Sequence, residues 1–290
     1  MDNIASPAAV RALLQKHGLQ AKKSLGQNFL IDRNILDKII EGSELHHEDY
    51  VVEIGPGLGV MTVELARRCR GVLAIDVDTS LKPVLNELSA AHNNVRIIFG
   101  DVLKTDIEKE LALAFHLPQS PPFKVCANIP YNITTPLIFQ LLEQCGNLSS
   151  ATLMIQKEVS DRLKARPGSK DYGRLTVTTA FYADIEPITS VSRNCFYPKP
   201  DVDSAVIKII PHDRYRSQLE HPTMFGHILK SAFQKRRKTI TNVLAGLLPL
   251  EKEEITTQLN ALGIEPALRP ENLSITDYIR LANKFGVIKD

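Results

Sequence analysis

The sequence predicts an α/β fold in which a largely parallel sheet has helices on both faces and a small helical region follows. Short apolar runs of strand length alternate with stretches of helical periodicity through the first half of the chain. The expected strands are residues 51–54, 72–77, 95–99, 123–127 and 151–156, and the expected helices between them are 60–70, 79–90, 134–145 and 158–165. Such alternation is typical of a parallel sheet that is covered on both sides.

Before the sheet, the chain is expected to form two helices joined by a basic loop. Ser6 can cap a helix over residues 7–17, with Gly18 just beyond its end. The basic segment 21–30 follows as a loop, and residues 32–41 are expected to be helical.

After the parallel strands, a hairpin-like pair of strands near 185–191 and 204–210 is expected to complete the sheet. Segment 173–183 is rich in β-branched residues, and its local propensity favours a strand. The polar stretch 211–222 marks a domain boundary. Proline and glycine residues separate the helices expected beyond it, which are 223–247, 251–261 and 274–285.

A glycine-rich turn follows the first predicted strand and indicates a nucleoside-binding site. Residues 55–59 have the sequence Gly-Pro-Gly-Leu-Gly, and a helical pattern begins directly after them. Gly55 and Gly57 allow the backbone to approach a ligand closely, whereas Pro56 removes an amide that a pyrophosphate could bind. The spacing also lacks the third glycine of a dinucleotide fingerprint. We therefore expect a ligand without phosphate groups.

Two acidic residues end the next two strands. Asp76 is placed where it can accept hydrogen bonds from both hydroxyl groups of a ribose. Asp101 follows Gly100 after the third strand, where it can accept from the amino group of an adenine. Either acid alone could be a strand-end cap or a turn residue. Their succession after a glycine turn favours a shared ligand.

The tetrad Asn128-Ile129-Pro130-Tyr131, at the end of an apolar strand, suits the alkylation of an aromatic amine. The Asn128 side-chain oxygen and the Ile129 carbonyl can accept hydrogen bonds from such an amine. Pro130 removes a donor and fixes φ, which leaves the Ile129 carbonyl without local turn pairing. Tyr131 offers a flat face to a base removed from its stack. The alternative is an ordinary Asn-x-Pro turn.

In this order, the motifs resemble the ribosomal RNA adenine N6,N6-dimethyltransferases, which use S-adenosylmethionine. The resemblance spans nearly the whole chain. Asp76 stands where the family usually has Glu, and Ile129 stands where this branch usually has Leu. The segments that carry the resemblance are residues 21–30, 53–59, 100–103, 128–131, 156–159, 172–175, 196–200, 202–206 and 233–239.

The resemblance implies a Rossmann-like methyltransferase sheet with helices on both faces, plus a small C-terminal helical domain. Residues 1–212 would form the S-adenosylmethionine-binding catalytic domain, with the N-terminal helix and basic loop at 1–31. Residues 213–290 would form a helical rRNA-binding domain. The resemblance also makes segment 173–183 a helix, against its local propensity.

The function implied is N6,N6-dimethylation of two adjacent adenosines near the 3′ end of small-subunit (16S) rRNA, with a role in ribosome biogenesis. S-adenosylmethionine would be the methyl donor and S-adenosylhomocysteine the product. Asn128 and the Ile129 carbonyl would hold the amine, with Pro130 leaving that carbonyl unpaired. Tyr131 and Phe196 would stack on the base from its two sides. Phe196 could instead be a core aromatic residue. The residues implied in cofactor binding are Asn28, Leu30, Gly55, Gly57, Asp76, Asp101 and Asn128.

Asn28 and Leu30 are expected to close over the methionine part of the cofactor, the alternative being a tether for the N-terminal helix. The net charge of +2 does not by itself indicate a nucleic-acid partner. Basic residues are locally concentrated, however, since segment 230–238 contains five and no acid. A solvated helix face is the alternative. The residues expected to bind RNA are Lys22, Lys23, Lys157, Arg162, Lys235, Arg236, Arg237 and Lys238.

Length and composition predict a cytoplasmic enzyme of two domains, and the family resemblance implies that it acts on the small ribosomal subunit, where we expect it to be a monomer. A length of 290 residues, of which 43% are hydrophobic, is sufficient for two domains. No window approaches about 18 uninterrupted apolar residues, so no membrane association is expected. The cysteines lack metal-binding spacing, which predicts free thiols and no metal site, at Cys69, Cys126, Cys145 and Cys195.

Three other functions remain open at this point. A large-subunit rRNA adenine N6-methyltransferase of the antibiotic-resistance type would use the same chemistry, although segments 172–175 and 233–239 favour the small-subunit branch. A DNA amine methyltransferase would be expected to have Pro-Pro in place of Ile129-Pro130. A ribosome assembly factor whose binding matters more than its catalysis would tolerate loss of Asn128 or Gly57, and both are present.

Overall fold

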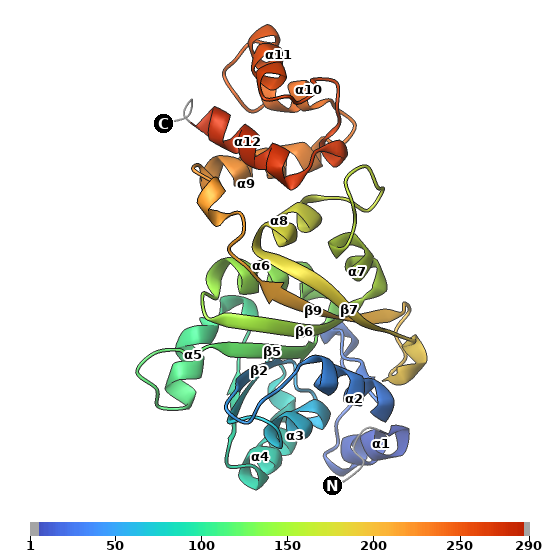
Figure 1. Cartoon of the computed structure of the whole chain (residues 1–290). Helices are drawn as coiled ribbons and strands as arrows, with labels where there is room; N and C mark the ends of the chain where they lie inside the picture. Colours follow the sequence, from blue (N-terminus) through green and yellow to red (C-terminus); the bar gives the residue numbers. More distant parts are fainter. Residues whose placement is uncertain (1–5, 287–290) are drawn as a thin grey trace. The chain divides into compact units, whose positions relative to one another are not determined.

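The computed structural model describes residues 6–286 and divides the chain into two compact units (Figure 1). The first unit consists of the chain up to Ser160 together with Asp184–Pro211. The second consists of Asp161–Ala183 together with the chain from His212 onward.

The first unit is built on a seven-stranded sheet with the order β4-β3-β2-β5-β6-β9-β7. Strands β2 to β6 pair in parallel, and β9 pairs antiparallel with β6. The mixed α/β sheet is therefore confirmed, including the final pair of strands that completes it. The strands are β2 (Tyr50–Ile54), β3 (Gly71–Asp76), β4 (Val95–Phe99), β5 (Phe123–Asn128), β6 (Leu148–Gln156), β7 (Ala183–Val191) and β9 (Ser204–Pro211).

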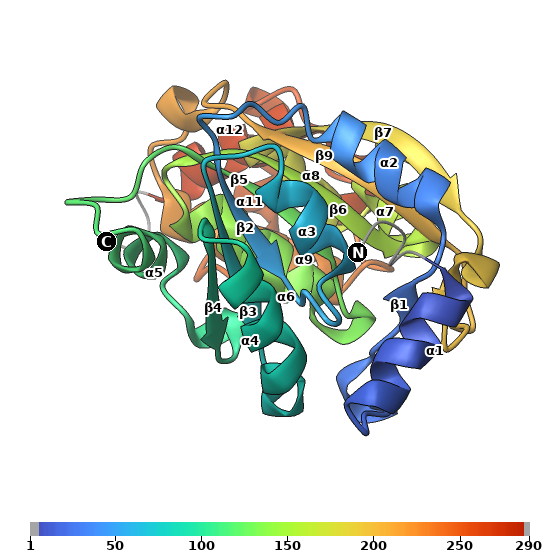
Figure 2. The ribbon, with the colours of Figure 1, turned by 90° about the horizontal axis from the view of Figure 1, so that it is seen from below.

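Helices cover both faces of this sheet, with α3 packed on β3 and α4 on β4 (Figure 2). On α2, Leu36 and Ile39 are buried in one apolar cluster with Val51 of β2 and Val72 of β3. Helix α5 lies outside the predicted elements, and Asp106 caps its first turn by accepting from the Lys109 N–H. The helices are α2 (Arg33–Gly42), α3 (Val60–Ala66), α4 (Lys82–Ala91), α5 (Ile107–Ala114), α6 (Thr134–Gln144) and α7 (Lys157–Leu163).

The N-terminal segment forms helix α1 (Pro7–Lys16) and then more structure than the expected loop. Ser6 caps α1, because its hydroxyl accepts from the Ala9 N–H at 3.2 Å. Strand β1 (Phe29–Leu30) pairs antiparallel with strand β8 (Phe196–Tyr197) in a separate two-stranded ribbon. This pairing fixes the segment that follows the basic loop.

The second unit is helical, and two expectations for it need correction. Segment 161–183 was expected in the first domain, within 1–212, but Val177 and Phe181 of α8 lie in the apolar cluster of the second unit. This burial also explains why β-branched residues form a helix there, since tertiary packing overrides local propensity. The helices are α8 (Arg174–Tyr182), α9 (Pro222–Gln234), α10 (Ile240–Ala245), α11 (Lys252–Ala261) and α12 (Ile275–Gly286).

The single helix expected over 223–247 is wrong, because the basic residues 235–238 form a turn between α9 and α10. The Arg236 guanidinium donates to the carbonyl oxygens of Lys170, at 3.0 Å, and Tyr172, at 3.1 Å. Thr239 then caps α10. Arg236 therefore joins two segments of the second unit.

None of the helices within 6–286 has the length and apolarity that a bilayer crossing requires. Short 3₁₀ turns connect many of the helices and strands. Among the cysteines, Cys69 and Cys126 are buried, and all four are free thiols. The 3₁₀ turns are Lys23–Leu25, Thr79–Leu81, Val102–Lys104, Tyr131–Ile133, Arg193–Cys195, Arg216–Gln218 and Pro270–Asn272.

We predict that Arg236→Gln lowers the free energy of unfolding by about 1 kcal/mol, because two hydrogen bonds from a charged donor are lost. The adjacent Arg237 is also exposed, and Arg237→Gln serves as the matched control, with an expected change within about 0.5 kcal/mol. Urea denaturation of both variants measures the difference. Equal stability of the two would show that the Arg236 contacts contribute nothing.

Candidate active site

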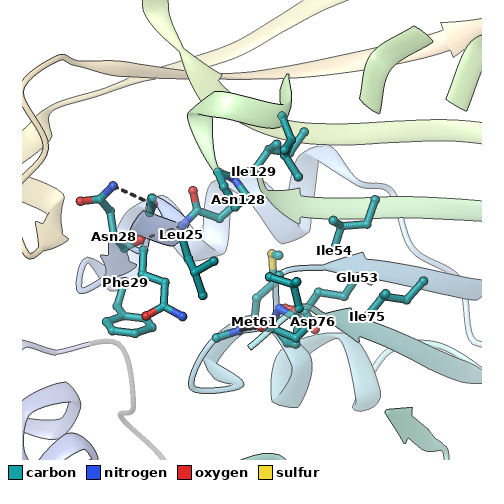
Figure 3. A pocket seen from close by; sticks show the side chains of 18 of the residues that line it. Leu25, Asn28, Phe29, Glu53, Ile54, Met61, Ile75, Asp76, Asn128 and Ile129 are labelled. Atoms are coloured by element: carbon teal, nitrogen blue, oxygen red, sulfur yellow. Dashed lines mark hydrogen bonds between the residues drawn. The ribbon is translucent and has the colours of Figure 1, made fainter. Parts of the chain in front are cut away.

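A cavity of about 280 Å³ lies at the carboxyl ends of the central strands. The sheet order places β2 between β3 and β5, so the chain reverses its direction of winding at this point. Ligands of open α/β sheets bind at such a switch point. The walls come from the ends of β2, β3 and β5, from the glycine turn and from the N-terminal segment 25–30 (Figure 3).

The glycine turn after β2 requires backbone conformations that other residues rarely adopt. Gly55 and Gly57 have φ values of 67° and 57°. A β-carbon at position 57 would lie only 3.1 Å from the ring of Phe29. The absence of a side chain at Gly57 therefore lets the N-terminal segment lie close to the turn and close one side of the cavity.

Asp76 lies at the cavity but is already engaged with the main chain. Its carboxylate accepts from the Asp78 N–H at 2.8 Å and from the Gly57 N–H at 3.2 Å. Burial raises the pKa of Asp76, and these hydrogen bonds oppose the rise. The short side chain of Asp thus braces the glycine turn. A carboxylate has about four acceptor sites, so Asp76 keeps acceptor capacity for a ligand hydroxyl beside its main-chain donors.

Asp101 lines the cavity from the loop after β4. One carboxylate oxygen accepts from the Leu103 N–H at 3.0 Å and caps the 3₁₀ turn that follows. The other oxygen lies 3.7 Å from the ammonium group of Lys104. With 41% of its side chain exposed, Asp101 keeps acceptor capacity toward the cavity.

Asn128 ends β5 with its side-chain amide held in one orientation. The Asn128 Nδ2 donates to the backbone carbonyl of Asn28 at 2.9 Å. Because the amide has a single oxygen, this hydrogen bond leaves Oδ1 available as an acceptor. Figure 3 shows Asn128 and Asn28 on adjacent segments of the cavity wall.

The Ile129 carbonyl is a second acceptor beside the Asn128 amide. The Ile129 N–H donates to the Met154 carbonyl at 3.1 Å, and the side chain is buried. Pro130 has no N–H to offer to the turn. Within residues 6–286, no hydrogen bond ends on the Ile129 carbonyl oxygen. Two acceptors are thus adjacent at the end of β5.

Tyr131 lines the cavity, whereas Phe196 does not. The Tyr131 hydroxyl shares a hydrogen bond of 2.8 Å with Ser204, which fixes the ring, and burial raises its pKa. Phe196 is only 3% exposed, because it pairs with Leu30 in the β1–β8 ribbon and packs into the apolar core. Phe196 thus occupies the core position that the sequence left as its alternative, and its role as a second stacking face stays a prediction.

Glu53 is a cavity residue to which the sequence assigned no individual role. Its side chain is 1% exposed, and neither carboxylate oxygen has a hydrogen-bond partner among the described residues. Burial, with a smaller contribution from the charge of Asp76, raises the pKa of Glu53 to about 8. The sequence feature that could have indicated a role for Glu53 is the presence of an acid inside an otherwise apolar strand.

The residues at the cavity fit the S-adenosylmethionine that the resemblance implies. The buried carboxyl of Glu53, which has no hydrogen-bond partner among the described residues, suits a cationic ligand. Pro56 has no backbone N–H, so the glycine turn offers one amide fewer to a phosphate group. All of the predicted catalytic and cofactor-binding residues except Phe196 line this one cavity, namely Asn28, Leu30, Gly55, Gly57, Asp76, Asp101, Asn128, Ile129, Pro130 and Tyr131.

The residues predicted to bind RNA do not share one environment. The Lys22 ammonium donates to Asp78 at 2.6 Å and to Ser80 at 2.9 Å, and Arg236 is engaged within the second unit. These two cations are thus used inside the protein. The remaining predicted residues are exposed, as Lys22 and Arg236 also are, and they are Lys23, Lys157, Arg162, Lys235, Arg237 and Lys238.

A family model described as Ribosomal RNA adenine dimethylase matches residues 18–286. The chain belongs to this family. It is 41% identical over 287 residues to Ribosomal RNA small subunit methyltransferase A of Listeria monocytogenes, covering 98% of this chain and 97% of that protein. The protein of the same name in Bacillus mycoides is 40% identical over 286 residues, covering 98% of this chain and 97% of that protein.

Solved structures agree with the family and with the Rossmann-like methyltransferase fold. A dimethyladenosine transferase from Plasmodium falciparum has a TM-score of 0.74 at 29% identity, covering 89% of this chain and 98% of that chain. The 23S rRNA methyltransferase ErmE has a TM-score of 0.64 at 27% identity, covering 89% of this chain and 99% of that chain. The predicted fold and family are confirmed.

We predict that Glu53→Gln removes a pH dependence of stability. The unfolded chain ionises Glu53 near the ordinary pKa of 4.5, whereas the folded chain keeps the proton to about pH 8. Raising the pH through this window therefore destabilises the ligand-free wild-type protein, by up to about 1.4 kcal/mol per pH unit.

Urea denaturation of both proteins at several pH values within that window measures this effect. The variant should gain stability relative to the wild type as the pH rises. A stability difference that is constant with pH would mean that Glu53 ionises normally in the folded protein.

Proposed function

We propose that this protein transfers methyl groups from S-adenosylmethionine to N6 of two adjacent adenosines near the 3′ end of 16S rRNA in the small ribosomal subunit. The observation that carries the proposal is the pair of acceptors at the end of β5, Asn128 Oδ1 and the Ile129 carbonyl, at the wall of the cavity. The relatives at 40% and 41% identity, both named Ribosomal RNA small subunit methyltransferase A, support the choice of substrate.

The acceptor pair answers a specific chemical difficulty. The lone pair of the adenine exocyclic nitrogen is delocalised into the ring, which makes the amine a poor nucleophile. Acceptors placed at Asn128 and Ile129 bind the two N–H groups and favour a tetrahedral nitrogen whose lone pair is available. S-adenosylmethionine supplies a methyl group already activated on a sulfonium, so no general base is obligatory.

The same pair also serves a second methyl transfer. A monomethylated amine keeps one N–H, which either Asn128 or Ile129 can still bind. Tyr131, which Ser204 holds in place at 2.8 Å, provides the face on which the adenine ring stacks. This arrangement is compatible with dimethylation, because no acceptor is used up by the first methyl group.

Three carboxyl groups supply the remaining polar contacts of the cofactor site. Asp101 accepts from the adenine amino group of the cofactor, and Asp76 accepts from its ribose with the lone pairs that the main chain leaves available. Glu53 faces the cationic part of the cofactor from the floor of the cavity. Asn28 and Leu30 close the methionine end.

The exposed basic residues hold the RNA by its phosphates. We assign this role to Lys23, Lys157 and Arg162, and to the turn between α9 and α10 with Lys235, Arg237 and Lys238. Lys22 is left out because it pairs with the buried carboxylate of Asp78, and Arg236 because it binds the carbonyl oxygens of Lys170 and Tyr172. In this proposal the enzyme acts as a monomer in the cytoplasm, and the helical second unit contributes to rRNA binding.

We predict that Asn128→Ala reduces the rate of methyl transfer by about 100-fold or more, because the hydrogen bond to N6 is needed mainly in the transition state. Affinity for small-subunit particles should change less than threefold. Single-turnover transfer and filter binding measure the two quantities. An equal loss of both would make Asn128 structural, and Asn93→Ala, in an exposed loop of the same unit, serves as the control.

The substrate is tested by incubating the enzyme with tritiated S-adenosylmethionine and purified ribosomal subunits that lack the modification. The expected result is methyl incorporation into small-subunit particles, with N6,N6-dimethyladenosine as the labelled nucleoside. Incorporation only into large subunits would instead support the ErmE-like alternative. Binding of small subunits without any methyl transfer would support an assembly factor.

A further inference from the structure

The N-terminal segment 22–30 forms one wall of the cofactor cavity and is tethered to the rest of the first unit at several points. Its carbonyl at Asn28 accepts from Asn128, and its Phe29 ring lies close to Gly57. Lys22 and Gln27 of this segment also bind Asp78, in the turn after β3. This last tether has no part in the function proposed above.

The Asp78 carboxylate is the centre of a compact polar cluster, and its side chain is only 3% exposed. Its Oδ1 accepts from the Lys22 ammonium at 2.6 Å, and its Oδ2 accepts from the Gln27 amide at 2.8 Å. Ser80 donates its hydroxyl and its N–H to Oδ1 as well, at 2.6 and 3.0 Å. The Gln27 Oε1 in turn accepts from the Lys22 N–H at 2.9 Å.

We infer that Asp78 is a positioning residue which, through Lys22 and Gln27, holds segment 22–30 over the cofactor cavity and so keeps the Asn28 carbonyl against Asn128. We call the Asp78, Lys22 and Gln27 side chains the latch. The inference rests on the proposed function, because it assigns the latch to retention of the cofactor and to orientation of the amine acceptor.

The connection from the latch to the acceptor pair is short. Gln27 is bound to Asp78 by its side chain, and the next residue, Asn28, binds Asn128 by its carbonyl. If Gln27 were released from Asp78, the neighbouring Asn28, whose carbonyl fixes the Asn128 amide, would also become less restrained. The same release would open the wall formed by residues 25–30.

The energetics favour a closed latch. An ion pair with one buried partner is costly to break, because the buried carboxylate would be left uncompensated. Burial disfavours ionisation of Asp78, but the hydrogen bonds from Lys22, Ser80 and Gln27 outweigh it and hold its pKa at about 2. The carboxylate thus remains charged above about pH 4, and its contribution to stability is lost only as the pH falls toward 2.

The latch is not needed to anchor helix α1. Val10 and Leu14 of α1 are buried in an apolar cluster with Leu81 and Leu85 near α4. A separate exposed ion pair of 2.8 Å joins Lys16 of α1 to Glu87 of α4. Loosening of the latch should therefore affect residues 22–30 without releasing α1.

The test uses the full-length protein with S-adenosylhomocysteine as the probe. Lys22→Gln removes the ion pair but leaves the Asp78 cap of Ser80 in place, and Lys22→Arg keeps the charge. Asp78→Asn is the second variant, since its amide oxygen can still cap the turn. Lys16→Gln is the control, because it breaks another ion pair between a lysine and a carboxylate, which is exposed and does not involve a residue that lines the cavity.

Dissociation of S-adenosylhomocysteine is followed by stopped flow, and hydrogen exchange of the ligand-free protein is followed for residues 22–30. We expect Lys22→Gln and Asp78→Asn to accelerate dissociation by about three- to tenfold and to increase exchange in this segment. Lys22→Arg should restore both toward the wild-type values, and Lys16→Gln should leave both unchanged.

Unchanged dissociation and exchange in Lys22→Gln would overturn the inference. An increase of exchange confined to α1 would also overturn it, since the pair would then be only a tether for that helix. These measurements need no RNA, so a failure of the proposed methyl transfer to small subunits would be seen separately, in the wild-type protein.

Discussion

One hydrogen bond, from the Asn128 side chain to the Asn28 carbonyl at 2.9 Å, joins the two parts of the chain on which the proposed chemistry depends. Asn128 belongs to the end of β5, whereas Asn28 lies a hundred residues earlier in the sequence, in a segment that precedes the seven-stranded sheet. An amide side chain has one acceptor oxygen, so its orientation decides whether it can receive an N–H from a substrate. The N-terminal segment is therefore part of the active site as well as a wall of the cofactor cavity.

The parallel sheet makes this meeting possible. Strands β2, β3 and β5 end at the same edge of the sheet. In the glycine turn after β2, the absence of a side chain at Gly57 leaves room for the ring of Phe29. Some polar groups at this edge of the sheet bind other parts of the protein, and others remain available to a ligand. Asp76 mainly braces the turn, whereas Glu53 remains without a partner in the described part of the chain.

The strands, the glycine turn and the tetrad could be predicted because each is encoded by adjacent residues. Features that depend on distant residues could not. Local propensity favours a strand over 173–183, and only the family resemblance implied the helix, which forms because the second unit buries Val177. Phe196 is buried because β1 pairs with β8, although its sequence motif suggested a stacking face. Charge patterns had the same limit, since Lys22 and Arg236 were predicted to bind RNA but have partners inside the protein.

The central claim is that Asn128 Oδ1 and the Ile129 carbonyl together hold the amine of the target adenine. A crystal structure with S-adenosylhomocysteine and an adenosine-containing oligonucleotide tests it most directly. The account predicts that N6 lies within hydrogen-bond distance of both oxygens, with the Asn128 Nδ2 still bound to Asn28. An adenine amine bound elsewhere, or an Asn128 amide turned to present its nitrogen to the base, would contradict the account.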